Sequence, residues 1–93
     1  MPVVFHIPGF LRAFTNGSSQ VTLEAMPPTA GTALEALWTL HPGIRDRVVN
    51  EQGEVRQHVN VFVGDESIRY TGGLGTPLTG TCEITIVPAV SGG

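Results

Sequence analysis

The last two residues of the chain, Gly92 and Gly93, offer the group best suited to chemistry, a main-chain carboxylate with no side chain beside it. They follow shortly after residues 83–87, Glu-Ile-Thr-Ile-Val, an alternating run typical of a β-strand. Because glycine lacks a Cβ atom, a Gly-Gly end is thin and reaches backbone conformations closed to other residues. Such an end could enter a narrow tunnel and present its carboxylate to the active site of a partner. The simpler interpretation is a terminus that happens to be rich in glycine.

Other side chains are weaker candidates for chemistry. Cys82 alternates with Ile84 and Ile86, so we expect a small buried residue and not a nucleophile, which needs a basic and partly exposed setting. Ser91 has no base partner in a recognisable pattern. The three histidines lack the short spacing of metal ligands, and we expect them at surface or satisfied strand positions: His6, His41 and His58.

Residues 72–75, Gly-Gly-Leu-Gly, are rich in glycine, but they match a phosphate-binding loop poorly. No Gly-Lys-Ser/Thr follows them and no helical pattern begins behind them, so a tight turn between strands is the better interpretation. No internal group then makes the chain an enzyme by itself, and the C-terminal carboxylate is the reactive candidate that remains.

Composition indicates one small folded domain. The chain has 93 residues, 41% of them hydrophobic, a net charge of −3 and a single cysteine, which excludes an intramolecular disulfide or a four-thiolate iron–sulfur cluster. Five arginines are scattered along the sequence without a basic stripe, so we expect no nucleic-acid partner. No apolar run approaches the roughly 20 residues of a membrane span, and the N-terminus lacks the basic segment of a signal peptide. The expected location is therefore the cytoplasm, with no membrane association.

The chain contains no lysine. Compositional bias explains this absence adequately. It would also suit a chain whose C-terminus becomes an activated acyl group, because a lysine amine attacks carbonyl centres once it is deprotonated.

The elements that must position the C-terminus follow from hydrophobic periodicity. Strands are predicted over residues 3–7, 20–25, 59–63 and 81–87, with a further short edge strand over 67–70. The first two are expected to form a hairpin with a long connection. A helix is predicted over about 33–41, with Thr32 as N-cap, Glu35 completing a capping box, and a stop at residues 41–43, His-Pro-Gly. Residues 44–49 predict a further short helical turn.

This element order predicts an α+β fold, a mixed four- to five-stranded sheet with one main helix on one face. The other face of such a sheet would be free for a partner. The division that we predict is a domain over residues 1–87 and a C-terminal tail over residues 88–93.

The end of the chain, residues 84–93 (Ile-Thr-Ile-Val-Pro-Ala-Val-Ser-Gly-Gly), resembles that of the ubiquitin-like sulfur-carrier family of the MoaD and ThiS type. A proline after the last strand, a small or apolar residue and Gly-Gly form the ending of this family. Residues 59–76 look most like the branch that serves cysteine biosynthesis, CysO. The resemblance implies a β-grasp, ubiquitin-like fold over nearly the whole chain.

The resemblance also implies a function. An E1-like adenylyltransferase or sulfurtransferase would adenylate Gly93 with ATP, sulfur would displace AMP, and the resulting thiocarboxylate would donate its sulfur. Val90, Ser91 and Gly92 would accompany Gly93 into partner sites. The chain itself would bind no cofactor or metal and would be a co-substrate, not an enzyme, and the sulfur acceptor of the cysteine branch would be a cysteine-synthase-like PLP enzyme.

Two alternatives stay open within this resemblance. The chain could be the small subunit of molybdopterin synthase, although its ending, Pro88-Ala89-Val90, differs from the Pro-Pro-Val frequent there. Its partner would then be the large subunit of that enzyme. It could also be a ubiquitin-like protein modifier, attached to lysines of target proteins.

Overall fold

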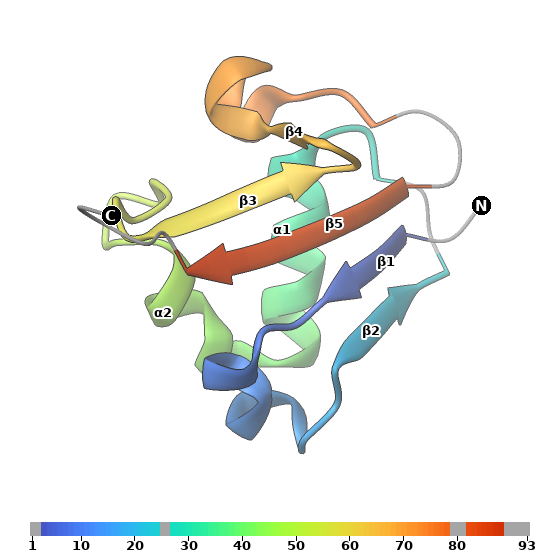
Figure 1. The fold of residues 1–93 in the computed structure, drawn as a ribbon, viewed down its shortest axis with the longest axis vertical. Helices are drawn as coiled ribbons and strands as arrows, with labels where there is room; N and C mark the ends of the chain where they lie inside the picture. The colour runs from blue at the N-terminus through green and yellow to red at the C-terminus, as the bar shows by residue number, and fades with distance from the viewer. Residues whose placement is uncertain (1–2, 25–26, 79–81, 89–93) are drawn as a thin grey trace.

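The computed structural model describes residues 3–24, 27–78 and 82–88, and within these ranges the chain forms a mixed sheet of five strands (Figure 1). The strands lie in the order β2-β1-β5-β3-β4. Their bounds are β1 (Val3–His6), β2 (Gln20–Leu23), β3 (Val59–Val63), β4 (Glu66–Ser67) and β5 (Cys82–Pro88). The α+β fold and the mixed sheet predicted from the sequence are confirmed, and the arrangement is that of a β-grasp domain.

Strand β5 is the longest strand and occupies the centre of the sheet. It runs parallel to β1 on one side and antiparallel to β3 on the other. Its alternation is the predicted one, because Cys82, Ile84 and Ile86 are buried at 8%, 0% and 1% exposure while Glu83 is exposed. The last strand in the sequence is thus held by neighbours along both edges and by the core beneath it.

The N-terminal hairpin is also confirmed. Strands β1 and β2 pair antiparallel from Val3 opposite Leu23 to His6 opposite Gln20. The long connection between them contains a 3-10 helix, η1 (Gly9–Thr15). This helix ends at Asn16, whose φ of 57° places it in the left-handed region that asparagine tolerates better than most residues.

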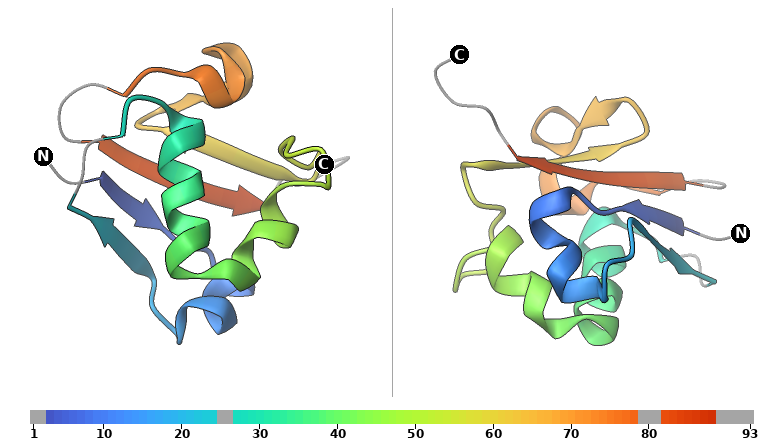
Figure 2. Two further views of the ribbon diagram at one scale, coloured as in Figure 1. Left: turned by 180° about the vertical axis from the view of Figure 1, so that it is seen from behind. Right: turned by 60° about the horizontal axis from the view of Figure 1, so that its bottom comes forward.

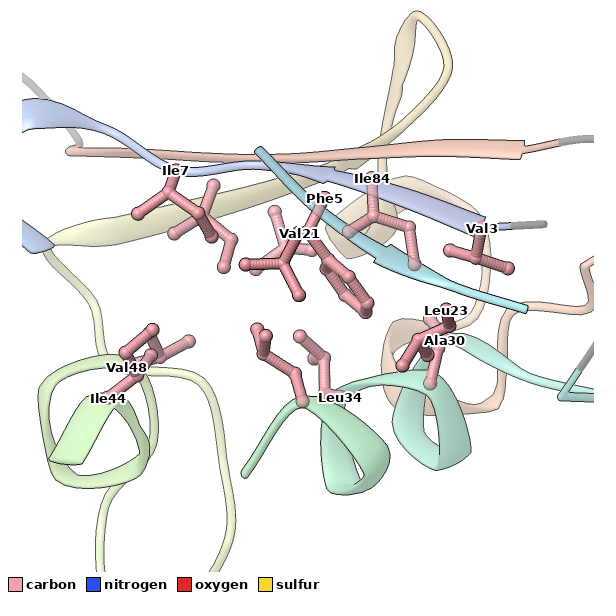
Figure 3. Close-up of a cluster of buried hydrophobic side chains, with 14 of the residues drawn as sticks. Val3, Phe5, Ile7, Val21, Leu23, Ala30, Leu34, Ile44, Val48 and Ile84 are labelled. Atoms are coloured by element: carbon pink, nitrogen blue, oxygen red, sulfur yellow. The ribbon is translucent and has the colours of Figure 1, made fainter. Parts of the chain in front are cut away.

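The main helix, α1 (Ala30–Leu40), packs its apolar side against one face of the sheet. Figure 2 shows α1 and the short helix α2 (Arg45–Val48) on the same side of the sheet. They are the two α-helices of the described residues. Figure 3 shows Phe5 and Ile84 pointing from the sheet toward the helical layer, where Leu34 is only 1% exposed. A helix therefore covers one face, as the periodicity predicts.

The predicted N-cap of this helix is wrong. The helix begins three residues earlier, with Thr29 as N-cap, and its capping box joins Thr29 and Thr32. The Thr29 hydroxyl accepts from the Thr32 backbone N–H at 3.2 Å, and the Thr32 hydroxyl accepts from the Thr29 backbone N–H at 3.0 Å. The pattern Thr32-x-x-Glu35 is misleading because Thr32 already serves as the inner partner of an earlier box.

We expect Thr29→Ala to lower the free energy of unfolding by about 1 kcal/mol, because it removes the side-chain acceptor at the helix N-terminus. Glu35→Ala, at the partner position that the sequence predicts, should leave stability almost unchanged. Urea denaturation of both variants measures the difference. Equal losses in the two variants would contradict the observed cap.

The predicted edge strand over residues 67–70 is largely wrong. Only Glu66 and Ser67 form β4, and Ile68–Tyr70 is a 3-10 helix, η3. The Ser67 hydroxyl accepts from the Arg69 backbone N–H at 3.3 Å, which starts the turn, and the turn buries Ile68 at 2% exposure. Because the 3-10 turn directs Ile68 into the core, the chain does not continue here as a strand with alternating side chains.

Residues 42–48 confirm the predicted helical turn, as a 3-10 helix, η2 (Pro42–Ile44), followed by α2. In the described part of the chain, no helix is long and apolar enough to cross a membrane.

Candidate functional site at the end of the central strand

The residues that the sequence predicts as the reactive end, Val90, Ser91, Gly92 and Gly93, lie outside the described residues. The structure does describe the platform to which they are attached. Strand β5 continues to Pro88, which pairs with Val59 at the start of β3. The division into a domain and a tail stays a prediction, with the strand extending one residue beyond the expected boundary at residue 87.

The register of the sheet fixes where β5 ends. Val87 pairs with Asn60 and Ile86 with Val61, next to the pair of Pro88 and Val59. Val59 and Val61 are buried at 0% and 1% exposure, so the residues of β3 that pair with the end of β5 are fixed in the core. The described part of β5 therefore ends on the side of the sheet where β1 also ends and β3 begins.

The face of the sheet away from α1 presents a mixed surface. The register places His6, Thr85 and Phe62 in one row across β1, β5 and β3, with Val87 and Asn60 in an adjacent row. All five side chains are half-buried, between the core and full exposure. The sequence predicts a helix on one face of the sheet and an open face opposite it. It does not predict which side chains form a row on the open face, because that depends on the strand order.

His6 lies beside a carboxylate on this face. Its Nε2 atom is 2.5 Å from Oε1 of Glu83, on the neighbouring strand β5. This contact joins two strands 77 positions apart in the sequence. Among the described residues, no group of three or more His, Cys, Asp and Glu side chains could hold a metal ion.

The glycine-rich segment 72–75 does not form an open phosphate loop. It folds into a 3-10 helix, η4 (Gly73–Gly75), and the N–H groups of Gly75 and Thr76 form hydrogen bonds within the segment. The N–H of Gly75 donates to the carbonyl of Gly72, and both the N–H and the hydroxyl of Thr76 donate to the carbonyl of Gly73. The segment packs against the first turn of α1, where a Cβ atom on Gly31 would lie 2.9 Å from the Leu74 carbonyl oxygen.

Arg69 is a structural residue near the end of β5 that sequence reasoning missed. Its Nη2 atom donates to the carbonyl oxygen of Val59 at 2.8 Å and its Nε atom to Oδ1 of Asn60 at 3.1 Å. The same nitrogen, Nη2, also reaches the carbonyls of Arg56 and Gln57 at 3.2 and 3.3 Å. One guanidinium thus organises the segment that enters β3, and the spacing of 9 to 13 residues offers no signal in the sequence.

The five-stranded mixed sheet with β5 at its centre and α1 across one face is the β-grasp fold of ubiquitin-like proteins. The family model described as the ThiS family matches residues 5–93, and the chain belongs to this family of ubiquitin-like sulfur carriers.

Individual relatives agree with this assignment. The chain is 36% identical over 95 residues to sulfur carrier protein CysO of Mycobacterium tuberculosis, and the match covers 100% of both chains. It is 37% identical over 65 residues to small archaeal modifier protein 1 of Haloferax volcanii, covering 70% of each. The crystal structure of the Amycolatopsis orientalis BexX/CysO complex matches with a TM-score of 0.85 and 36% identity, covering 98% of this chain and 99% of the other. These similarities support a sulfur-carrier role.

Proposed function

We propose that this chain carries sulfur as a thiocarboxylate on Gly93 and donates it for cysteine biosynthesis. The observation that carries the proposal is the connection of a firmly anchored central strand to a Gly-Gly end, in a chain similar over its whole length to CysO. Val90, Ser91 and Gly92 would enter partner sites together with Gly93. The platform would remain outside and dock through surfaces near the end of β5.

The chemistry requires activation because a carboxylate is a poor electrophile. In the proposed sequence the carboxylate of Gly93 attacks the α-phosphorus of ATP, and pyrophosphate leaves. Sulfide, or the terminal sulfur of a persulfide, then forms a bond to the acyl carbon as AMP leaves. A persulfide-linked product is released as the thiocarboxylate when a thiol reduces the S–S bond. These steps belong to the active site of an E1-like partner, and the chain is the co-substrate.

The donation step needs an electrophilic acceptor. In the proposed pathway the sulfur of the thiocarboxylate forms a C–S bond with an aminoacrylate held by a cysteine-synthase-like PLP enzyme. Hydrolysis of the acyl–sulfur bond then frees cysteine and restores the carboxylate. No cofactor is required on this chain, and we place the reaction in the cytoplasm, where ATP is supplied to the activating partner.

The choice of acceptor is tested by mixing the thiocarboxylated chain with each candidate enzyme. With a cysteine-synthase-like enzyme that holds an aminoacrylate, we expect one cysteine per chain consumed, measured by amino-acid analysis. The chain in its carboxylate form is the matched control and should yield none. Sulfur transfer to a molybdopterin synthase large subunit alone would overturn the cysteine assignment and favour that alternative.

A protein modifier is the second candidate function, favoured by the similarity to small archaeal modifier protein 1. In that case the activated acyl group would be captured by lysines of target proteins. The chain has no lysine, so the 93 residues offer no side-chain amine for chains of linked copies. Conjugates that each contain a single copy per target lysine, seen as shifted bands in cells that express a tagged chain, would support it.

A further inference from the structure

Charged side chains are divided between the two ends of the sheet. Four carboxylates lie at the end where β5 begins: Glu24 directly after β2, Asp65 in the turn between β3 and β4, Glu66 as the first residue of β4, and Glu83 as the second residue of β5. All four residues are exposed. Arg69 belongs to η3, which follows β4 directly, but its guanidinium donates to the carbonyl of Val59 at the other end of β3.

The arginines gather instead around the end where β5 stops. Strand β1 runs parallel to β5, and η1 follows directly after it, so η1 lies at this end of the sheet. Within η1, Arg12 is exposed, and its Nε atom donates to the carbonyl of Ile7 at 3.0 Å. Arg47 of α2, also exposed, has its guanidinium 5.4 Å from the centre of the Phe14 ring of η1.

Two more arginines contact the segment that enters β3: Arg56 is part of it, and Arg69 of η3 donates to it. Arg56 donates from Nε to the carbonyl of Asp46 at 2.8 Å, which ties this segment to α2. Arg69 donates to the carbonyl of Val59 at 2.8 Å, and Val59 is the residue paired with Pro88. The strand order therefore brings together side chains that are dispersed in the sequence. We call Arg12, Arg47, Arg56 and Arg69 the arginine collar.

No arginine of the collar forms an ion pair with a carboxylate among the described residues. Arg45, which is outside the collar, lies 3.3 Å from the carboxylate of Asp46. Glu51 and Glu54 are at the same end, but neither forms an ion pair with an arginine among the described residues. The collar residues interact with backbone carbonyls, an amide oxygen and an aromatic ring, which are neutral groups: Arg12, Arg47, Arg56 and Arg69.

The position of the collar matters because of the length of chain beyond it. Five residues follow Pro88, and five residues span at most about 18 Å when fully extended. An enzyme that acts on the carboxylate of Gly93 must therefore bring the mouth of its active site close to the end of β5. The surface of the partner around that mouth would face the arginine collar.

We propose that the partner that activates Gly93 has a rim of Asp and Glu side chains around its tail-binding channel, and that this rim pairs with the arginine collar. The opposite, acidic end of the chain would be repelled by the same rim, so the charges orient the encounter as well as strengthen it. A polyanion such as nucleic acid is a poorer fit, because the net charge of the chain is −3. This inference depends on the proposed sulfur-carrier function, since it assigns a partner surface to that function.

The test is ATP–pyrophosphate exchange catalysed by a purified E1-like adenylyltransferase, measured over a range of carrier concentrations. Arg12→Gln and Arg47→Gln, alone and combined, remove collar charges at exposed positions. We expect the double variant to raise KM about tenfold at low ionic strength with kcat unchanged, and the difference to shrink at high salt. Circular dichroism melting confirms that each variant is folded.

A matched control separates the collar from net charge. Thr22 is exposed and lies on β2, toward the end of the sheet away from the collar. Thr22→Glu changes the net charge from −3 to −4, as each single arginine substitution does. It should leave KM unchanged within about twofold. Equal effects of Thr22→Glu and Arg47→Gln, or no effect of the double variant, would overturn the inference while the wild-type exchange still supports the carrier function. Absence of exchange with the wild-type chain would contradict both.

Discussion

Deletion of Gly93 is expected to abolish activation of the chain while leaving its fold intact. Removal of one residue withdraws the terminal carboxylate by about 3.5 Å, and a misplacement of about 1 Å at a reacting centre can already cost a hundredfold in rate. We therefore expect ATP–pyrophosphate exchange to fall by at least about a hundredfold. The measurement compares the variant with the full chain at the same adenylyltransferase concentration.

We expect the fold to be unaffected because a single residue at the end of a chain usually contributes little to the stability of a domain. Among the described residues, β5 is held in the sheet by its pairing with β3 as far as Pro88 and by the buried side chains of Ile84 and Ile86. A thermal melt that matches that of the full chain shows that the loss is chemical and not structural. A second variant, extended by Ala-Ala after Gly93, keeps both glycines but moves the carboxylate and should be equally inactive. Full activity in either variant would rule out Gly93 as the acceptor of the adenylyl group.

The second large effect is expected in the core, with Ile84→Ala in the centre of β5. Ile84 is 0% exposed and points from the sheet toward the helical layer (Figure 3). Truncation of a buried isoleucine to alanine loses transfer free energy and leaves a cavity, which together cost about 2 to 5 kcal/mol. A small domain has only about 5 to 15 kcal/mol of stability in total, so the midpoint of urea denaturation should fall markedly.

Thr85→Ala, at the next position of the same strand, is the matched control. Thr85 faces the open side of the sheet and is half-buried, so its truncation should change the free energy of unfolding by less than about 1 kcal/mol. If Ile84→Ala is as mild as Thr85→Ala, the inward face of β5 has been assigned wrongly.

Hydrophobic periodicity predicted most of the platform. The alternation of Cys82, Ile84 and Ile86 is a local pattern, and the structure buries these three residues. Residues 59–63 form β3 with the predicted bounds, and Leu34 and Leu37 lie on the buried side of α1. In each case one face of an element meets the core, so the sequence pattern follows directly from burial.

Features that depend on competition between local interactions were predicted less well. Both Thr29 and Thr32 can act as an N-cap, and the earlier start buries Ala30 at 0% exposure and lets its N–H donate to the carbonyl of Thr76. Ile68 could continue a strand, but it is buried by a turn that Ser67 caps. The choice in each case depends on tertiary burial, which is not visible in a local window.

The residues that lie near the end of β5 could be identified only from the topology of the sheet. Strand order places β5 between β1 and β3, and only then do Arg12 and Arg69, 57 positions apart, belong to one end of the sheet. The sequence points to the Gly-Gly end because no other residue in it matches the pattern of a metal ligand, a nucleophile or a phosphate-binding loop. Its residues lie outside the described ranges, so the role of Gly93 stays a prediction.

The intact mass of the chain tests the central claim most directly. The chain is incubated with an E1-like activating enzyme, ATP and sulfide, then measured by mass spectrometry beside a sample without ATP. We predict a gain of about 16 Da, the replacement of one oxygen by sulfur, located on Gly93 by fragmentation and absent without ATP. An unchanged mass with an enzyme that adenylates the chain, or a gain located elsewhere, would contradict the account.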